Sequence, residues 1–523
     1  MGTAFSALRS TIRGIRSVVS LLLDLSAEFN LALKRASKTP GLPNPNPIHS
    51  YWLTDPPFPE LENTRSDELP KTADVAIIGS GITGAAIAWS LLHERRRRDV
   101  DIHNKVVVFE ARQLCSGATA RNGGHIKAVP YETFPRLSKM MSHERAAALT
   151  RFQIRHLECL TKLCRAEGIE MAEAREVETV DLFLDEKTFR ERVKDVETLK
   201  DWIPEVEIST FGSNDTVKGA LSYQAGAIWA YRFVVSIWKR LLDKFSHSLS
   251  IETNTPVDSI SISLNGPPGL PYEVRTSRGV THVRHVVHAT NGFACHLVPG
   301  LVRKIVGARA HMSAQRPGQQ FPRSEGNRSW SVVYGGGFDY ATQRPPSSRD
   351  KSGDILLGGG FIRSLKQGVD QIGLYDDSTS PDPLTITHIA GLFPATFHPK
   401  WGAGAELKDV WTGILGFTGD LLPLVGQLDE RLTGRKIGTW GHALSGKKQC
   451  GEWIAAGFSG EGMIWAWLCG SGLGIMIAGS EEEDLPELPG RPDGKLKEWF
   501  PNELLICPDR LRSADVSNLA NQS

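Results

Sequence analysis

The glycine-rich segment from Gly79 to Gly84, which reads Gly-Ser-Gly-Ile-Thr-Gly, restricts what this chain can fold into more than any other feature. It follows a short apolar run at 74–78, whose β-branched residues are typical of a buried parallel strand. The pattern of a helix follows at 85–92. Glycines at this spacing permit a tight turn and let the backbone approach a pyrophosphate, whose charge the helix N-terminus stabilises. Together these features predict a doubly wound α/β fold that binds a dinucleotide.

The next strand expected in such a fold ends in a carboxylate. Residues 105–109 form a second β-branched run, and Glu110 follows them, where it can accept hydrogen bonds from ribose hydroxyls. The separation from Gly84 exceeds the usual spacing of about 20 residues. We attribute the excess to a solvated, charged loop that includes Arg95–Arg98. NAD(P) and FAD share this fingerprint, so the pattern alone leaves both cofactors open.

The overall composition excludes several other classes of protein. The chain has 523 residues, enough for roughly three domain-sized units. Its net charge of +1 provides no global field for nucleic acid, so we expect no nucleic-acid partner. The seven cysteines include no Cys-x-x-Cys pair, and we expect free thiols and no metal site. The apolar run 454–478 contains Glu461 and several glycines, which argues against a transmembrane helix.

The first 38 residues differ from the rest of the chain. Arg9, Arg13 and Arg16 share one face of a helix and apolar residues cluster on another, which predicts a basic amphipathic leader at 1–38. The chain also begins Met-Gly-Thr-Ala-Phe-Ser, which fits the pattern for N-myristoylation of Gly2. Three interpretations stay open: an acylated leader that holds a cytoplasmic protein at a membrane surface, a mitochondrial transit peptide, and a helix packed on the protein's own surface.

Small residues dominate the segment after Glu110. Residues 115–125 read Cys-Ser-Gly-Ala-Thr-Ala-Arg-Asn-Gly-Gly-His. Such residues let the backbone pack against a flat cofactor, and the arginine could reach its phosphates. An ordinary glycine-rich loop would have the same composition, so this segment alone does not separate the two interpretations.

These motifs together resemble the FAD-dependent oxidoreductases related to D-amino-acid, glycine and sarcosine oxidases. The resemblance starts with the glycine-rich turn, the Phe-Glu-Ala-Arg strand end at Glu110 and the 115–125 segment. It continues in family order through 226–232, 285–292, 411–426 and the Gly-Phe-Ser-Gly-x-Gly-Met loop at 457–463. The collinear set favours FAD over NAD(P).

The resemblance implies an α/β protein with a Rossmann-like FAD-binding domain built from discontinuous segments. A second, α+β substrate domain would carry a mixed sheet that covers the flavin. The expected division of the chain is a Pro-rich linker at 39–71, the FAD-binding domain at 72–159, 226–299 and 406–480, the substrate domain at 160–225 and 300–405, and a polar tail at 481–523.

By the same resemblance, the cofactor contacts come from four stretches of chain. The predicted FAD-binding residues are Gly79, Ser80, Gly81, Ile82, Thr83, Gly84, Glu110, Ala111, Arg112, Thr119, Arg121, Asn122, Gly123, Gly124, Ala289, Thr290, Asn291, Gly457, Gly460, Gly462 and Met463.

Two histidines are candidate catalytic residues. The resemblance places His125 near the isoalloxazine side of the flavin, where an imidazole could act as a base or attach to the ring. His311 falls in a segment that resembles a strand bordering the family's pocket. A histidine is also a common structural donor, and that interpretation stays open for both.

The chain departs from sarcosine oxidases at three positions. Gly413 stands near the cysteine that bonds to flavin in those relatives, so noncovalent FAD is expected. Ile464 stands where they carry a carboxylate-binding lysine, and Gly358–Gly360 stand near their oxygen-activating lysine. These differences argue against a close sarcosine or small amino-acid oxidase.

The expected activity is oxidation of a carbon–nitrogen bond in a small-molecule amine or amino-acid-like substrate, with hydride transfer to flavin N5 and O₂ or another electron acceptor. One alternative is oxidation of a hydroxy acid or natural-product intermediate, and another is a membrane-tethered flavoprotein without turnover. Arg344 and Arg363 are candidates for binding a substrate carboxylate, although surface solvation is the default for both.

Overall fold

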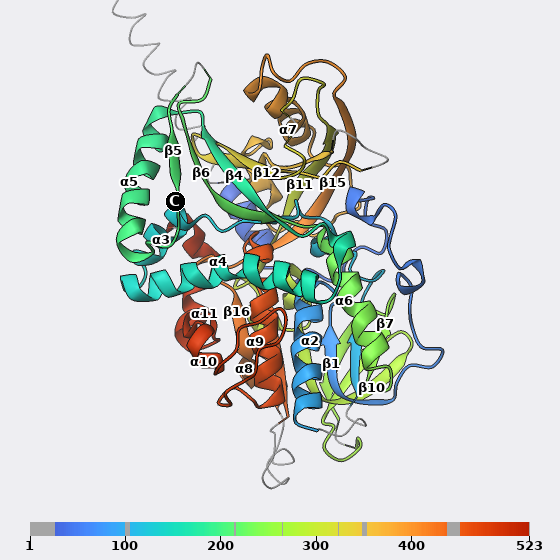
Figure 1. The fold of residues 1–523 in the computed structure, drawn as a ribbon. Coiled ribbons are helices and arrows are strands. Elements are labelled where there is room, and N and C mark those ends of the chain that lie inside the picture. Colours follow the sequence, from blue (N-terminus) through green and yellow to red (C-terminus); the bar gives the residue numbers. More distant parts are fainter. Residues whose placement is uncertain are drawn as a thin grey trace, which may run out of the picture.

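The computed structural model describes residues 27–99, 105–213, 216–263, 265–322, 324–347, 353–436 and 450–521 (Figure 1). Gly2 and the leader arginines lie outside the described residues. The described part of the leader, 27–36, is helical and packs on the body of the protein. Ala32 and Ala36 are buried there, and Arg35 donates to the carbonyl oxygens of Ile372 and Val369 at 2.8 Å each.

The first of two sheets contains the strand that precedes the glycine-rich turn. Its main path runs through β16 (Leu424–Gln427), β17 (Gly451–Ala456), β10 (Gly279–His288), β1 (Thr72–Ile78), β2 (Val106–Phe109) and β7 (Leu249–Glu252). The strands from β17 to β7 run parallel, and β16 is antiparallel to β17. The hairpin of β8 (Val257–Ile262) and β9 (Tyr272–Thr276) extends from β10.

The two faces of this sheet are covered differently. Along β1, Val75 and Ile77 pack with the helices, whereas Ala76 and Ile78 pack with the β8–β9 hairpin. This alternation follows from the two-residue period of a strand. The helices are α2 (Ile82–Arg97), α6 (Ala230–Lys244) and α9 (Ala466–Ala478). The run 454–478 therefore forms β17 and the buried α9, and none of the described helices is long and apolar enough to span a membrane.

The second sheet is mixed. Its strands, in spatial order, are β15 (Glu406–Phe417), β11 (Val306–Arg316), β14 (Ile355–Gly359), β13 (Gly337–Gln343), β12 (Arg328–Tyr334), β4 (Arg175–Phe183), β6 (Gly219–Ala227) and β3 (His125–Ile126), with β5 (Ser209–Phe211) beside β6. Among the described strands of this second sheet, only the β12–β4 pair is parallel. The predicted α/β fold class is confirmed.

Helices border the second sheet on two sides. In Figure 1, α7 (Pro383–Thr396) lies near the β11–β15 edge, and α3 (Pro130–Ser138), α4 (His143–Ala166) and α5 (Glu186–Trp202) lie toward β4 and β6. The short helices α8 (Glu430–Thr433), α10 (Leu496–Trp499) and α11 (Pro508–Ser513) pack near β16 and α9.

The sheets do not follow the expected segment boundaries at every point. β3 and β15 belong to the second sheet, although the segments 72–159 and 406–480 were assigned to the cofactor domain. The reason is pairing: β15 pairs with β11 from Val306 to Arg316, and β3 pairs with the end of β6. The chain therefore crosses between the sheets inside these two segments.

The linker and the tail both pack against the body of the protein. In the linker, Trp52 is 3% exposed and its indole N–H donates to the carbonyl of Asn122. In the tail, Phe500 and Leu504 are buried in the main core, and Ile506 N–H donates to the carbonyl oxygen of Val425 at 2.9 Å. A few large apolar residues anchor each segment despite its proline or charge content.

The four consecutive arginines are not a solvated loop, because α2 continues to Arg97. Arg95 is buried in an ion pair with Asp74, and Arg97 pairs with Glu94 at 2.9 Å. The helix thus gains an ionic cluster at its C-terminal end, where cations interact favourably with the helix dipole.

Substitution of Gly84 tests whether α2 must lie close to the turn that follows β1. A Cβ at Gly84 would lie 2.0 Å from the carbonyl oxygen of Gly79, so Gly84→Ala must push the helix off the turn. We expect a loss of at least ~1–3 kcal/mol in stability and a lower melting temperature of the holoenzyme. The control is Gly391→Ala in α7, which has open space around the new methyl group and should gain up to ~1 kcal/mol. Equal melting temperatures for the two variants would contradict this close approach.

Candidate active site

A cavity of about 1070 Å³ is bordered by residues of both sheets. Its lining includes the β1–α2 turn, the end of β2, the segment after Glu110, the end of β10 and the 457–463 loop. It continues to β11, β13 and α3. A cavity of this size is at the upper end of the range for small-molecule sites and can hold a large ligand.

The β1–α2 turn presents a helix N-terminus to this cavity. Gly79 has a φ of +108°, and a Cβ there would lie 2.6 Å from the carbonyl oxygen of Ala289. Gly81 is the N-cap of α2, and the N–H of Ile82 donates to Thr119 Oγ1 at 3.0 Å. The other N–H groups of the first turn have no partner within the helix, so they are available to an anion.

Glu110 lines the cavity and also stabilises the β1–α2 turn through hydrogen bonds. Its Oε2 accepts hydrogen bonds from the N–H and hydroxyl of Ser80 at 3.0 and 2.6 Å, and its Oε1 accepts from the N–H of Arg112 at 3.0 Å. Ser80 Oγ in turn accepts from the N–H of Cys115 at 2.8 Å. A carboxylate has further lone pairs, so Glu110 can hold this loop and also accept from a ribose.

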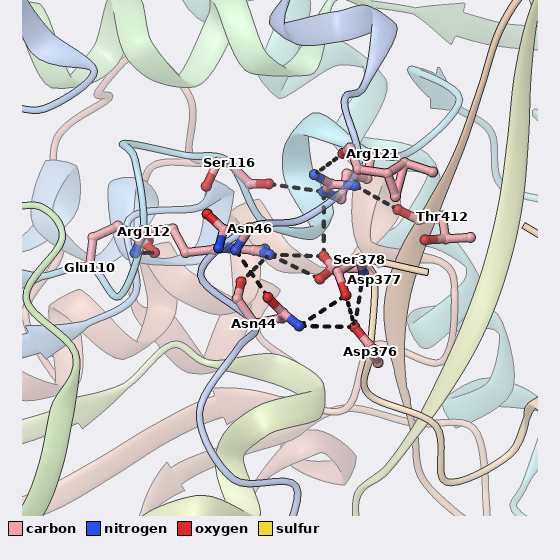
Figure 2. A network of polar contacts seen from close by, with 11 residues as sticks. Asn44, Asn46, Glu110, Arg112, Ser116, Arg121, Asp376, Asp377, Ser378 and Thr412 are labelled. Carbon is pink, nitrogen blue, oxygen red and sulfur yellow. Dashed lines mark hydrogen bonds and ion pairs between the residues drawn. The ribbon is translucent and has the colours of Figure 1, made fainter. Parts of the chain in front are cut away.

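Arg112 and Arg121 converge on Asp377, which is 2% exposed (Figure 2). Arg112 Nη1 lies 2.9 Å from Asp377 Oδ2, and Arg121 Nε lies 3.6 Å from the same oxygen. Asn44 and Ile48 of the linker join this group, because Arg112 donates to Asn44 O at 3.4 Å and Ile48 N–H donates to Asp377 O at 2.9 Å. We call these residues the Asp377 cluster.

Arg121 also donates hydrogen bonds to the backbone. Its Nε, Nη1 and Nη2 reach the carbonyl oxygens of Ser116, Thr412 and Ile48 at 3.1, 2.8 and 2.8 Å. Burial lowers the pKa of Arg121 to about 10. Arg112 and Arg121, both predicted to bind the cofactor, line the cavity. Each already donates to a carboxylate or carbonyl group, which favours a structural role.

The glycines after Arg121 let three elements meet. A Cβ at Gly123 would lie 2.4 Å from the ring of Tyr340, and one at Gly124 would lie 2.2 Å from the carbonyl oxygen of Ile228. Asn122 stabilises this bend, since its Oδ1 accepts from the N–H of Gly124 at 2.7 Å. The bend carries the chain from the cofactor segments to β3.

The two candidate catalytic histidines both line the cavity and both are neutral. His125 Nε2 lies 2.9 Å from Ser329 Oγ, and burial lowers the pKa of His125 well below its usual range. His311 Nε2 accepts the N–H of Asp382 at 3.0 Å, and burial lowers the pKa of His311 to about 4. His311 is 1% exposed, which favours a structural role, whereas His125 has more access to the cavity.

The C-terminal cofactor segments meet at Asn291. Its Oδ1 accepts from the N–H groups of Gly457 and Phe458 at 3.0 and 3.3 Å. The hydroxyl of Thr290 is buried without a hydrogen-bond partner among the described residues, as expected at a wall that a ligand completes. Of the predicted cofactor residues, all line the cavity except Ser80, Gly84, Gly124 and Gly457.

Sequence reasoning missed a buried polar network on the far wall of the cavity. Asp181 accepts from Lys127, and its Oδ2 accepts from the hydroxyls of Tyr131 and Tyr223 at 2.6 and 2.7 Å. Lys127 also donates to Ser331 Oγ at 2.6 Å. In the sequence, Asp181 shares the two-residue period of β4 with Val177 and Thr179, which would place it on their face of the strand.

The two arginines considered for a substrate carboxylate do not line the cavity. Arg344 forms an ion pair of 2.6 Å with Glu173 and is mostly buried, which corrects the expectation of surface solvation. Arg363 is exposed, which agrees with the expectation of surface solvation. Within the described part of the chain, no group of three His, Cys, Asp or Glu residues could hold a metal ion.

The fold and this site define a dinucleotide-dependent enzyme, and comparison with known families specifies the class. The model of the FAD dependent oxidoreductase (DAO) family matches residues 74–473, and the chain belongs to this family. FAD is therefore its cofactor, and the predicted resemblance and enzyme class are confirmed. A search of curated proteins gave no match.

Solved structures share the fold at low sequence identity. L-proline dehydrogenase from P. horikoshii is 19% identical, with 83% of this chain and 98% of that chain covered and a TM-score of 0.52. Glycine oxidase from Geobacillus kaustophilus is 18% identical, with 78% and 94% covered and a TM-score of 0.53. Iminodiacetate oxidase from Chelativorans sp. BNC1 is 15% identical, with 77% and 95% covered and a TM-score of 0.55.

The residues present fit FAD. The first turn of α2 offers free N–H groups to a pyrophosphate, the glycines at 79 and 84 leave no room for side chains, and Glu110 offers an acceptor to a ribose. The described residues that line the cavity include no cysteine. Noncovalent attachment stays a prediction, and the individual cofactor contacts do as well.

The Asp377 cluster yields a prediction with an adjacent control. Asp377→Asn leaves two buried arginines without their carboxylate, and we expect a loss of about 3–5 kcal/mol in stability. Asp376→Asn, one residue away, changes an exposed carboxylate whose hydrogen bonds from Asn44 and Ser378 all go to Oδ1, an acceptor that asparagine retains. It should alter stability by no more than about 0.5 kcal/mol. Thermal unfolding of both holoenzymes measures the difference. Similar melting temperatures would show that the buried ion pair does not hold these segments together.

Proposed function

We propose that this protein oxidises a carbon–nitrogen bond of a small amine or amino-acid-like substrate. Bound FAD supplies the electron-accepting chemistry, namely the uptake of a hydride at N5. The proposal rests on the family and on one feature of the cavity, which extends past the predicted cofactor contacts to a polar wall at Lys127, Tyr131 and Asp181. The three similar structures described above are named as enzymes of proline, glycine and iminodiacetate, and each of these compounds contains a carbon–nitrogen bond.

The protein's own residues position the substrate and set its protonation. An amine must be unprotonated before hydride leaves its α-carbon, because a cationic nitrogen cannot stabilise the developing iminium. The low pKa of His125 keeps its imidazole neutral at neutral pH, so it can hydrogen-bond to a substrate without adding positive charge beside it. Trp52, Tyr340 and the glycines at 123 and 124 pack around this position and limit the access of water.

Anaerobic reduction of the flavin tests the reaction class. The purified holoenzyme is mixed with amines, amino acids and hydroxy acids, with amino and hydroxy compounds of matched carbon skeleton. We expect the yellow flavin absorbance to bleach with amino compounds only, and readmission of O₂ then separates an oxidase from a dehydrogenase. Bleaching by hydroxy acids alone would support the alternative substrate class. Flavin that no compound reduces would support a flavoprotein without turnover.

We also propose that the leader holds the protein at a membrane surface through an acylated Gly2. A single acyl chain binds only weakly, and the leader arginines would supply the second, electrostatic contribution. Intact-mass measurement of the native protein should show the increment of a myristoyl group. A mature protein whose N-terminus lies beyond the leader would support a transit peptide. An intact chain with an unmodified Gly2 would support the third interpretation, a helix packed on the protein's own surface.

A further inference from the structure

The cavity has a polar end that lies away from the β1–α2 turn. There, α3 and α5 contact one another on the flank of the molecule opposite β1 and β10 (Figure 1). We call this the α3–α5 end of the cavity. It is lined by Lys127, Tyr131, Glu132, Asp181, Arg192 and Asp195.

Most charges at the α3–α5 end are already paired. Lys127 forms an ion pair with Asp181, whose second oxygen accepts from two tyrosines. Arg192 forms an ion pair of 3.0 Å with Asp195, one turn further along α5. These two pairs contribute no net charge.

Glu132 is a carboxylate at this end without such a partner. It lies in the first turn of α3, and its carboxylate has no hydrogen bond or ion pair to the described residues. Its side chain keeps a large exposed fraction, yet burial raises the pKa of Glu132. Both observations fit a side chain that projects into the cavity and not into bulk solvent. Inside a cavity the side-chain surface is accessible, although protein surrounds it.

A second carboxylate adds negative potential on the same wall. Glu461, between the predicted cofactor residues Gly460 and Gly462, lines the cavity. After burial itself, Arg192 and Lys127 lower the pKa of Glu132, whereas Asp181 and Glu461 raise it. Its Oε2 accepts from Gln153 Nε2 at 3.2 Å and from the indole of Trp465 at 3.1 Å. Those donors are neutral, so they leave its charge uncompensated.

Two other cations line this end from α3. Arg136 lies one turn beyond Glu132, and Lys139 is exposed at the C-terminal end of the helix. Neither forms an ion pair with Glu132 within the described part of the chain. Arg192 and Lys127 each form an ion pair with an aspartate, so neither pairs directly with Glu132. A carboxylate that accepts no hydrogen bond and forms no ion pair in an enclosed site is a binding group for an organic cation.

We propose that Glu132 binds a protonated amino group of the substrate other than the nitrogen whose carbon bond is oxidised. This inference rests on the proposed function. The two nitrogens must differ, because a carboxylate beside the reacting nitrogen would stabilise its ammonium form and oppose loss of hydride. The substrate class is therefore a diamine, or an amine that carries a second cationic group.

The test uses the anaerobically reduced holoenzyme, which binds amines without oxidising them. Calorimetry compares putrescine, butylamine and γ-aminobutyrate, which share a four-carbon chain and end in an ammonium, a methyl and a carboxylate group. We expect putrescine to bind most tightly to the wild type. Glu132→Gln should raise its Kd roughly ten- to a hundredfold, as loss of a charged hydrogen bond does, and should leave butylamine nearly unchanged.

Two further variants complete the design. Glu132→Asp retains the charge at a shorter reach and should retain part of the preference for putrescine. Glu144→Gln removes the matching glutamate from the first turn of α4, outside the cavity, and should behave as wild type. FAD content and melting temperature confirm that each variant is folded.

The outcomes separate this inference from the proposed function. Equal binding of putrescine and butylamine to the wild type, tighter binding of γ-aminobutyrate, or an equal loss for all probes in Glu132→Gln would overturn the role of Glu132. Oxidation of amines could still stand in each of those cases. Failure of every amine and amino acid to bleach the oxidised flavin would overturn the proposed function itself.

Discussion

The ion pair that Asp377 forms with Arg112 and Arg121 is the contact on which the arrangement of the site depends. It brings together the linker, the segment after β2 and the stretch before α7, which are far apart in the chain (Figure 2). A buried charge without its partner costs several kcal/mol, so these segments are stable only together. The cluster thereby holds the loop from Glu110 to Gly124 against β15, between the two sheets.

This arrangement changes which groups are left for the cofactor phosphates. Arg112 and Arg121 donate hydrogen bonds to Asp377 and to backbone carbonyl oxygens. These bonds order the loop and leave fewer donors for a ligand. The groups left to balance the charge of a pyrophosphate would then be the N–H groups and dipole of α2, whose first turn carries no acidic residue. An anion can approach a helix N-terminus when glycines keep the preceding turn free of side chains. The local motif is therefore enough to identify this anion-binding turn in the sequence.

The sequence predicted what is encoded locally and missed what depends on distant partners. The turn at Gly79–Gly84 and the strand end at Glu110 follow from short motifs, and the mixed second sheet was implied by the family resemblance that those motifs carry. The fold class and cofactor are confirmed. Burial of Trp52 and Phe500 was missed because proline and charge dominate their segments, although one large side chain suffices to anchor each. The partner of Lys127 lies on β4, and no spacing within either segment indicates that pairing.

The cavity therefore changes its electrostatic character along its length. At the β1–α2 turn, backbone N–H groups without partners in the helix favour an anion, whereas at the α3–α5 end the carboxylate of Glu132 is the group that we propose for a cation. The middle, at His125 and Gly123, is neutral and packed by aromatic rings. In a low-dielectric cavity such opposite ends orient ligands strongly, because each end repels the group that the other attracts. A dinucleotide and a cationic amine can thus share one cavity without competing for the same groups, and a substrate held at the far end by its charge presents its remaining length toward the cofactor.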